Sequence, residues 1–304
     1  QTIEVVSARA EALAIAVVVT DDLESELNED VFGCLVQYPA SDGELRDYRP
    51  IIAKAHAVGA LVTMAADILA LALVTPPGEL GADIAIGTTQ RFGVPMGYGG
   101  PHAAYFATTE EYKRQVPGRI IGLSKDARGK DALRMALQTR EQHIRRDRAT
   151  SNICTAQVLL AIIAGAYGVY HGPEGVRAIA NRVQRLTAAL AAGLTQLGHR
   201  VAHTAVFDTV RVTPQSADTV LEAALAAGIN LRDMGDGSLC VTLDETVTGG
   251  DLADVLTAFG ASAPDIEALL TATDSGIATA FARTTDYMTH PVFHSHRSET
   301  EMLR

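Results

Sequence analysis

The sequence predicts an α/β protein with a second, smaller α+β unit toward its C-terminal end. Three observations support this fold class. Continuous apolar runs alternate with amphipathic stretches in the first third of the chain, which is typical of a mostly parallel sheet covered by helices on both faces. One long apolar stripe then indicates a helix over 174–197. Beyond it, alternating strands and shorter helices indicate the α+β unit.

Hydrophobic periodicity predicts the individual elements of the first part. The Ala/Val/Ile run 14–20 predicts a buried strand, and 44–58 predicts a helix because its apolar residues share one face. Two prolines and two glycines in 75–81 predict a loop without regular structure. The other elements expected here are a helix over 3–13 and strands over 31–37, 61–64 and 83–87.

The later elements follow from the same reasoning. The polar stretch 125–131 predicts the tip of a hairpin, and the apolar stretch 155–170 predicts a helix that ends at His171-Gly172-Pro173. The small unit is expected to hold strands over 206–212 and 238–243 and helices over 218–227 and 250–259.

These elements divide the chain into three parts. We expect a partial large α/β domain over 1–171, an interdomain helix with a small α+β domain over 172–273, and an extended connector over 274–304. The chain begins at Gln1 without a methionine and stops inside a helical pattern. We therefore interpret it as an N-terminally truncated piece of a longer polypeptide, whose exposed core predicts association into a homo-oligomer.

Composition excludes several classes of partner. The formal net charge of −11 makes nucleic acid an unexpected partner. The longest apolar run, 153–170, is interrupted and short, so it predicts a core helix and not a membrane span. Cys34, Cys154 and Cys240 lie far apart in apolar settings, which indicates buried thiols in a reducing compartment.

The segment 88–91 carries the most informative polar side chains. It reads Thr88-Thr89-Gln90-Arg91, follows an apolar strand and precedes a Gly-rich bend. Sites in open α/β folds form at such strand ends. In many pyridoxal phosphate (PLP) enzymes this place carries a lysine that holds the cofactor through a Schiff base. An amide cannot do this chemistry, so Gln90 predicts a cofactor-enzyme scaffold without its own anchor.

Several long motifs together resemble the P-protein of the glycine cleavage system, glycine decarboxylase. They include the run from Thr89 through Gln-Arg-Phe-Gly-Val-Pro-Met-Gly-Tyr-Gly-Gly-Pro to His102. The resemblance covers nearly the whole chain. Its motifs occupy 81–83, 89–102, 117–122, 137–146, 149–157, 289–293 and 298–304.

The resemblance implies an aspartate-aminotransferase-like fold (PLP fold type I). It also implies two homologous halves, fused or separate, of which one holds PLP. That half has a His-Lys-Thr-Phe motif where this chain has Thr89-Gln90-Arg91-Phe92. It also has an aspartate that keeps the pyridine nitrogen protonated, and this position falls on Met64. A thioether cannot stabilise that charge, so Gln90 and Met64 are interpreted as lost PLP positions.

Two further groups are candidates for contact with a partner. Arg140, His143, Arg145 and Arg146 belong to a basic cluster, which is either a self-paired helix end or an anion-facing rim at an interface. The run Thr150-Ser151-Asn152 is suited to cap the apolar helix that follows. Within the resemblance, Thr150, Ser151 and Asn152 are also expected to reach the PLP phosphate of the partner half.

Other patterns carry weaker functional interpretations. The loop 97–100 could cradle a phosphate, but a tight turn is the favoured explanation of its glycines, because no helix begins after it. The four lysines lie in charged helix faces or polar turns, so none is expected to form a Schiff base. His290, His294 and His296 lie close together in the sequence, but no metal site is expected from them. A dinucleotide-binding oxidoreductase is not favoured, because the chain has no Gly-x-Gly-x-x-Gly turn after its first strand. The lysines are Lys54, Lys113, Lys125 and Lys130.

The function expected from the resemblance is that of the half of glycine decarboxylase that does not bind PLP. The family decarboxylates glycine and passes its aminomethyl group to the lipoyl arm of the H-protein. This half would complete the active-site wall and the lipoyl entry, and the fragment alone would be inactive. The alternatives are an active PLP transferase with an atypical lysine and a purely structural assembly module. We expect a cytoplasmic protein if it is bacterial and a mitochondrial one if eukaryotic.

Overall fold

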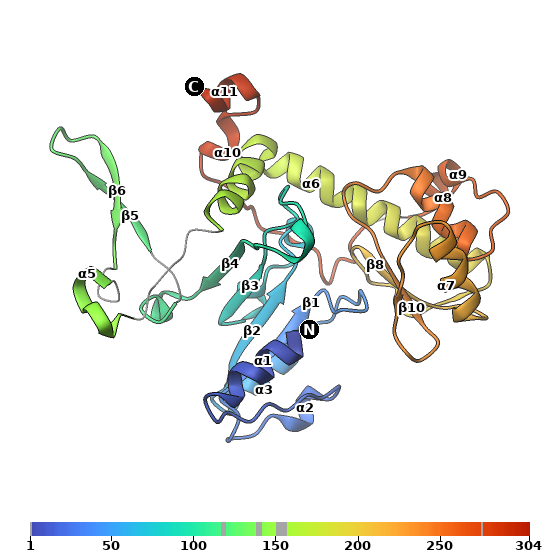
Figure 1. The fold of residues 1–304 in the computed structure, drawn as a ribbon, viewed down its shortest axis with the longest axis horizontal. Helices are drawn as coiled ribbons and strands as arrows, with labels where there is room; N and C mark the ends of the chain where they lie inside the picture. Colours follow the sequence, from blue (N-terminus) through green and yellow to red (C-terminus); the bar gives the residue numbers. More distant parts are fainter. Residues whose placement is uncertain (1, 117–119, 138–141, 150–156, 275) are drawn as a thin grey trace.

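A computed structural model describes residues 2–116, 120–137, 142–149, 157–274 and 276–304. A long helix, α6 (Val158–Gln196), runs from a four-stranded sheet to a smaller antiparallel sheet (Figure 1). No helix in these ranges is long and apolar enough to cross a membrane. The helices before the first strand are α1 (Thr2–Glu11) and α2 (Leu23–Glu26).

The large sheet has the strand order β1-β2-β3-β4. Its first three strands are parallel, as predicted, and its fourth is antiparallel to β3. The reversal arises because the Gly-rich bend after β3 returns the chain directly, with no crossover helix. The strands are β1 (Gly33–Tyr38), β2 (Leu61–Ala66), β3 (Ile84–Thr88) and β4 (Ala104–Thr108), and α3 (Arg49–Ala57) connects the first two.

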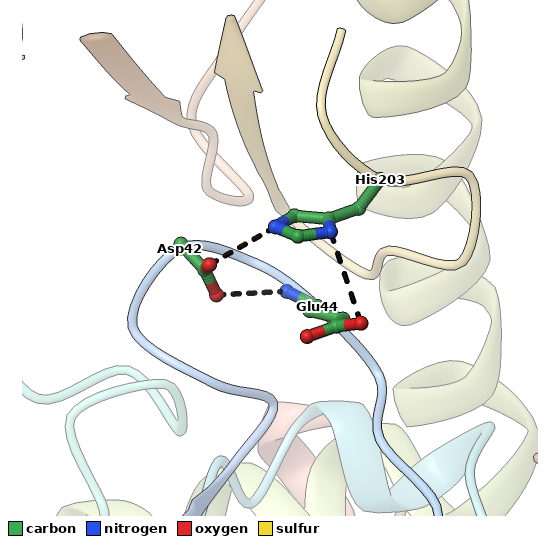
Figure 2. Close-up of side chains that lie close together, drawn as sticks. All are labelled: Asp42, Glu44 and His203. Atoms are coloured by element: carbon green, nitrogen blue, oxygen red, sulfur yellow. Dashed lines mark hydrogen bonds and ion pairs between the residues drawn. The ribbon is translucent and has the colours of Figure 1, made fainter. Parts of the chain in front are cut away.

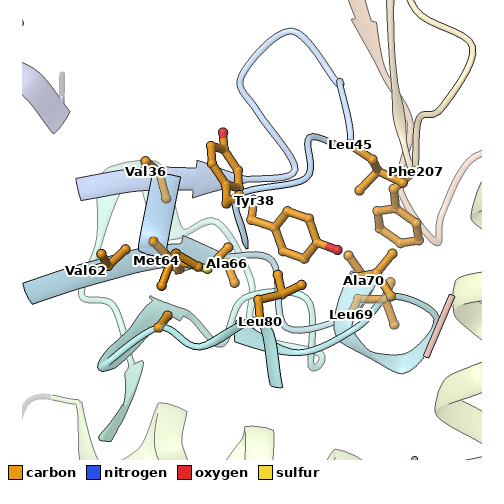
Figure 3. Close-up of a cluster of buried hydrophobic side chains, with 14 of the residues drawn as sticks. Val36, Tyr38, Leu45, Val62, Met64, Ala66, Leu69, Ala70, Leu80 and Phe207 are labelled. Atoms are coloured by element: carbon orange, nitrogen blue, oxygen red, sulfur yellow. The ribbon is translucent and has the colours of Figure 1, made fainter. Parts of the chain in front are cut away.

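One face of this sheet carries the first hydrophobic core. Val36, Met64 and Tyr38 point into it, and Phe207 enters it from the small unit (Figure 3). The opposite face is only partly covered, since Leu35 and Phe106 are 40% and 42% exposed. The expectation of helices covering both faces is therefore met on one face only.

Two local predictions are wrong. Residues 15–20 form no strand, and Val18 and Val19 are exposed. An apolar run predicts a need for burial, but a strand also needs a neighbouring backbone to bond. Residues 75–81 do contain regular structure, the one-turn helix α4 (Pro77–Leu80). Proline is accepted in a first helical turn, and Gly81 closes the helix at φ 102°.

A β-hairpin extends away from the sheet at one end of the molecule (Figure 1). It consists of β5 (Ile121–Lys125) and β6 (Asp131–Met135), so the predicted hairpin tip at 125–131 is confirmed. The helix α5 (Gln142–Arg145) and the 3-10 helix η4 (Arg146–Arg148) follow it. The other 3-10 helices are η1 (Ala70–Ala72), η2 (Gly97–Gly99) and η3 (Glu110–Tyr112).

The span α6 consists of two helices that meet at a kink at Gly172, so the predicted break at His171-Gly172-Pro173 is confirmed. Gly172 has φ 58°, and Pro173 follows it inside the helix. Side chains of the last segment bond backbone carbonyls on both sides of the kink. Arg297 Nη1 donates to His171 O at 2.6 Å, and Tyr287 Oη donates to Pro173 O at 2.7 Å.

The small unit has its own core and sheet. Its antiparallel strand order is β7-β8-β10-β9, and Leu190 and Leu194 of α6 pack against it with Leu252. The elements are β7 (Arg200–Val201), β8 (Thr209–Thr213), α7 (Ala217–Ala226), β9 (Arg232–Asp233), β10 (Leu239–Thr242), α8 (Gly249–Ala258) and α9 (Ile266–Ala272).

The last segment returns to the large sheet. Ala282 forms a bridge with Val74, and Tyr287 and Met288 pack against the first core. Two short helices, α10 (Val292–Ser295) and α11 (Glu299–Leu303), follow. The segment is irregular up to α10 but is bonded to the large domain through its backbone.

Candidate functional site

The segment that follows β3 is held at both ends. The backbone N–H and the Oγ1 of Thr89 both donate to Ala103 O, at 3.0 and 3.1 Å. Phe92 stacks on Tyr167 of α6 with ring centroids 5.3 Å apart. Gln90 and Arg91 lie between these two anchors, so the fold fixes where their side chains begin.

The strand ends approach one another closely at this point. A Cβ on Gly87 would lie 2.4 Å from Ala66 O and 2.5 Å from the Tyr105 ring, so only glycine fits. Tyr105 Oη donates to the same Ala66 O at 2.7 Å. Burial raises the pKa of the Tyr105 phenol, so it acts as a hydrogen-bond donor. These contacts place Asp67, the next residue after β2, close to the β3 end.

Gln90 and Met64 lie in different surroundings. Gln90 is half-buried, and Thr88 Oγ1 lies 3.4 Å from its Oε1. Met64 is fully buried in the first core beside Val62 and Ala66 (Figure 3). Neither side chain offers an amine or a carboxylate. The structure does not test the interpretation of these two residues as lost PLP positions, and it stays a prediction.

Arg91 joins the large sheet to the small unit. Its Nη1 donates to Asp208 Oδ2 at 2.9 Å, and its guanidinium lies over the Phe207 ring at 5.8 Å. Its Nε lies 3.8 Å from Asp67 Oδ2 and 3.9 Å from Glu245 Oε2. We call these four charged residues the Arg91 cluster: Asp67, Arg91, Asp208 and Glu245.

Each acid of the Arg91 cluster is positioned by its own element. Asp67 caps η1, because its Oδ1 accepts the N–H groups of Leu69 and Ala70 at 2.8 and 2.9 Å. Asp208 directly precedes β8, and Thr209 Oγ1 donates to its Oδ1 at 2.9 Å. Glu245 follows β10. The cluster therefore assembles at the ends of four strands, β2, β3, β8 and β10, which are remote in sequence.

Charge is not balanced in this cluster. Three carboxylates face one guanidinium, and the side chains of Arg91 and Asp208 are only 15% and 12% exposed. Burial raises the pKa of Asp208 to about 6, and the Asp67 carboxylate adds to the rise against the opposing charge of Arg91. Burial alone would lower the pKa of Arg91, but the carboxylates outweigh it and raise that pKa.

A second cluster between the large sheet and the small unit consists of Asp42, Glu44 and His203 (Figure 2). His203 Nε2 lies 2.9 Å from Asp42 Oδ2, and its Nδ1 lies 3.8 Å from Glu44 Oε1. Arg211 Nη1 lies 3.5 Å from Asp42, and Arg46 pairs with Glu44. Burial pushes the pKa of Asp42 upward, but the hydrogen bond and charge of His203 outweigh it and lower that pKa.

This second cluster is better explained as an ion-pair network than as a metal centre. Its potential ligand atoms lie within 4.8 Å of one another. However, the two ring nitrogens of His203 face different carboxylates, and one metal ion cannot bind both nitrogens of a single imidazole. Arg211 and Arg46 already supply positive charge to these acids. The cluster ties the loop after β1 to the segment before β8.

The weaker sequence candidates have structural roles. His290 Nδ1 accepts the Val292 N–H at 3.2 Å, and His294 bonds Met288 O at 3.1 Å. The loop 97–100 is a tight turn whose Tyr98 is fully exposed. Three of the lysines form surface ion pairs, and the fourth, Lys130, is exposed.

The sequence-predicted contact residues are described only in part. Thr150, Ser151, Asn152 and Arg140 lie outside the described residues, as does the side chain of His143. Arg145 and Arg146 are exposed, at the junction of α5 and η4. Sequence reasoning missed the roles of Arg91 and Asp208. The position of Arg91 after a buried strand was a signal, but nothing in the sequence pairs it with residues more than a hundred positions away.

Comparison with known proteins identifies clear relatives. The family model of the glycine cleavage system P-protein matches residues 1–259. Glycine dehydrogenase (decarboxylating) of Nostoc punctiforme is 55% identical, and that of Stutzerimonas stutzeri is 57% identical. Each match covers 100% of this chain and 32% of the relative, so the chain spans about a third of their length.

Solved structures support the same fold. The crystal structure of glycine decarboxylase (P-protein) of the glycine cleavage system, in inhibitor-bound form, is 35% identical with a TM-score of 0.69. The match covers 77% of this chain and 55% of that one. A NifS-like protein at 15% identity and a TM-score of 0.51 shares the fold alone. The predicted fold class, PLP fold type I with a small α+β domain, is confirmed.

Proposed function

This chain belongs to the glycine cleavage system P-protein family, and on that premise we propose that it forms the half of a glycine decarboxylase that does not hold PLP. The complete protein would decarboxylate glycine with PLP and pass the aminomethyl group to the lipoyl arm of the H-protein. In this proposal the chain does no covalent chemistry. It forms part of the wall of an active site whose cofactor is bound by the rest of the polypeptide.

The observation that carries the proposal is the chemistry at the end of β3. PLP needs an amine to hold its aldehyde, and residue 90 is a carboxamide. PLP also brings a phosphate of negative charge, whereas the Arg91 cluster already holds three carboxylates against one guanidinium. The guanidinium that could attract that phosphate is bonded to Asp208. The residues of this chain therefore do not fit PLP at this strand end.

The chain's exposed polar residues are proposed to act across an interface. Arg145 and Arg146 are exposed, and together with Arg140 and His143 they would form a rim that attracts anionic groups. Thr150, Ser151 and Asn152 would bond the PLP phosphate of the catalytic half. Ser, Thr and Asn are suited to this role because they accept and donate hydrogen bonds at the start of a helix.

Borohydride reduction of the complete parent protein, followed by peptide mapping, tests this proposal. Reduction fixes PLP to the lysine that carries it, and we expect the modified lysine to lie outside residues 1–304. An adduct on Lys54, Lys113, Lys125 or Lys130 would contradict the proposal and favour an active enzyme with an atypical lysine.

Two variants of the complete protein sharpen the test. We expect the Gln90→Lys variant to form no PLP adduct at residue 90 after borohydride reduction, because the three carboxylates around Arg91 remain. The double variant Thr150→Ala and Ser151→Ala should retain PLP more weakly than Thr257→Ala, a control at an exposed hydroxyl that bonds within α8. Unchanged PLP retention in the double variant would contradict the proposed contact of Thr150 and Ser151 with the PLP phosphate.

A further inference from the structure

The β5–β6 hairpin has one strongly apolar face that the described chain does not cover. Leu123 pairs with Leu133 in the ladder, and Ile121 lies two residues before Leu123, so these three side chains share a face. Ile121, Leu123 and Leu133 are 53%, 69% and 77% exposed. The Lys125–Asp131 ion pair closes the tip on the same face. We call this two-stranded element the hairpin arm.

The hairpin arm lacks support from either hydrophobic core. None of its residues belongs to the first or the second core, and Figure 1 shows the arm extending away from the large sheet. A two-stranded hairpin alone is at best marginally stable in water and needs packing on one face. Exposed apolar side chains gathered on one face of such an element indicate an interaction surface.

The residues that follow the arm in the chain carry a concentration of positive charge. Ile144 of α5 is 55% exposed, and Arg145, Arg146 and Arg148 beside it are also exposed. They form a local basic edge in a chain whose net charge is −11. A matching surface would offer an apolar strip bordered by carboxylates.

The occupant follows from the length of the relatives. Glycine dehydrogenases that match this whole chain are about three times as long, since the match covers 32% of them. We propose that the hairpin arm docks on the polypeptide that completes the parent protein, through an apolar strip with an acidic border. This inference rests on the proposed function, in which the chain works as one part of a larger enzyme.

A second copy of this chain is the less suitable occupant. Two copies that met through the same surface would be related by a twofold axis, and each would present the same residues to the other. The basic edges formed by Arg145, Arg146 and Arg148 would then approach one another. The charges of this surface therefore favour a partner of different sequence.

Photocrosslinking in the complete parent protein tests the inference. Benzoylphenylalanine replaces Leu123, and in a control protein it replaces Leu225, which is 71% exposed on α7. Mixed light and heavy isotope labels distinguish crosslinks within one molecule from those between copies. We expect crosslinks from residue 123 to peptides outside 1–304, and none to those peptides from residue 225. Crosslinks from 123 to residues 1–304 of a second copy, or no crosslink from 123, would overturn the inference.

Hydrogen exchange provides a measurement that does not depend on the crosslinker. In the complete protein, L123D/L133D should raise the exchange rates of amides 121–135 at least about tenfold, whereas L225D should leave them unchanged. Equal exchange rates in L123D/L133D and the unsubstituted protein would contradict docking. If docking fails while reduced PLP still maps outside 1–304, only the interface inference is lost and the proposed function stands.

Discussion

Gln90 and Arg91 are neighbours in the sequence after β3, but their side chains differ in burial and in the contacts they make. Gln90 is half-buried and makes only a long contact with Thr88. Arg91 is nearly buried and reaches Asp208, beyond the domain boundary. Removal of this guanidinium would leave three carboxylates near one another without a counter-charge, which is strongly destabilising. Arg91, the residue after Gln90, therefore connects the two domains.

The charge excess around Arg91 predicts a pH dependence of stability that belongs to Asp208. Its pKa is raised from an ordinary 3.8 to about 6 in the folded chain, so the folded state binds this proton more tightly. The contribution is fully present below the unfolded pKa and is lost as the pH rises through the folded pKa. From about pH 8 to about pH 5, the unsubstituted chain should gain about 1 kcal/mol of unfolding free energy relative to Asp208→Asn.

Urea titrations at the two pH values measure this difference. Asp254→Asn, at an exposed position of α8, is the matched control and should follow the parent chain at both pH values. If Asp208→Asn and the unsubstituted chain show the same change of unfolding free energy with pH, the pKa of Asp208 is not raised. The charge of the three carboxylates is then compensated elsewhere.

At the scale of elements, the kink in α6 depends on a contact with the last segment. Arg297 packs over Gly172, where a Cβ would lie 2.3 Å from the guanidinium carbon. The same side chain bonds His171 O and Glu174. Glycine is needed here for its φ of 58°, and an added methyl group would displace the end of the Arg297 side chain from its hydrogen bonds. The segment after residue 276 thereby fixes the direction of α6.

Substitution of Gly172 by alanine should therefore destabilise the chain more than an ordinary glycine substitution. We expect a loss of about 2 kcal/mol or more, because alanine both strains the backbone and displaces Arg297. Gly198→Ala is the comparison variant, since Gly198 also has a positive φ, 84°, but no atom lies within 4 Å of the place that a Cβ would take. Thermal unfolding of the two variants separates the backbone cost from the steric one.

The Arg297→Ala background completes this comparison. Without the guanidinium, Gly172→Ala should cost less than it does in the unsubstituted chain, because only the backbone strain remains. An undiminished cost of Gly172→Ala in that background would show that Arg297 is not what the new methyl group displaces.

At the scale of the whole molecule, one helix and two polar clusters connect the two hydrophobic cores. Val176 and Val183 of α6 belong to the first core, whereas Leu190 and Leu194 belong to the second. The Arg91 cluster and the Asp42–His203 pair bridge the same two bodies. Each cluster joins residues more than a hundred positions apart. The cores are thus coupled by α6 along the chain and by charge across the joint.

Removal of both bridges should separate the unfolding of the two cores. In the double variant Arg91→Leu and His203→Ala, we expect calorimetry to show two transitions where the parent chain shows one. The physical reason is that buried carboxylates left without a partner repel one another and open the joint. Breaking the Arg91 cluster should cost about 3 kcal/mol.

Arg49→Gln provides the control, because its partner Asp47 lies in the same body. It should unfold like the parent chain. A single transition in the double variant would mean that α6 alone couples the two cores and that the charged clusters are not needed for it.

The sequence by itself determined the family, the strand-helix order of the large domain and the absence of an amine at residue 90. These follow from local patterns: an apolar period, a turn signal or the chemical nature of one side chain. It failed at 14–20, where an apolar run pairs with no strand in the described chain. Its predictions for Thr150, Ser151 and Asn152 lie outside the described residues and stay predictions.

Only the tertiary structure decided where the charged side chains point. It brought Arg91 to Asp208 and Asp42 to His203, turned β4 antiparallel, and placed Arg297 against Gly172. These contacts join residues far apart in the chain, and their energies depend on burial and on neighbouring charge. Neither quantity is written in a local stretch of sequence, because both arise only when the whole chain has packed.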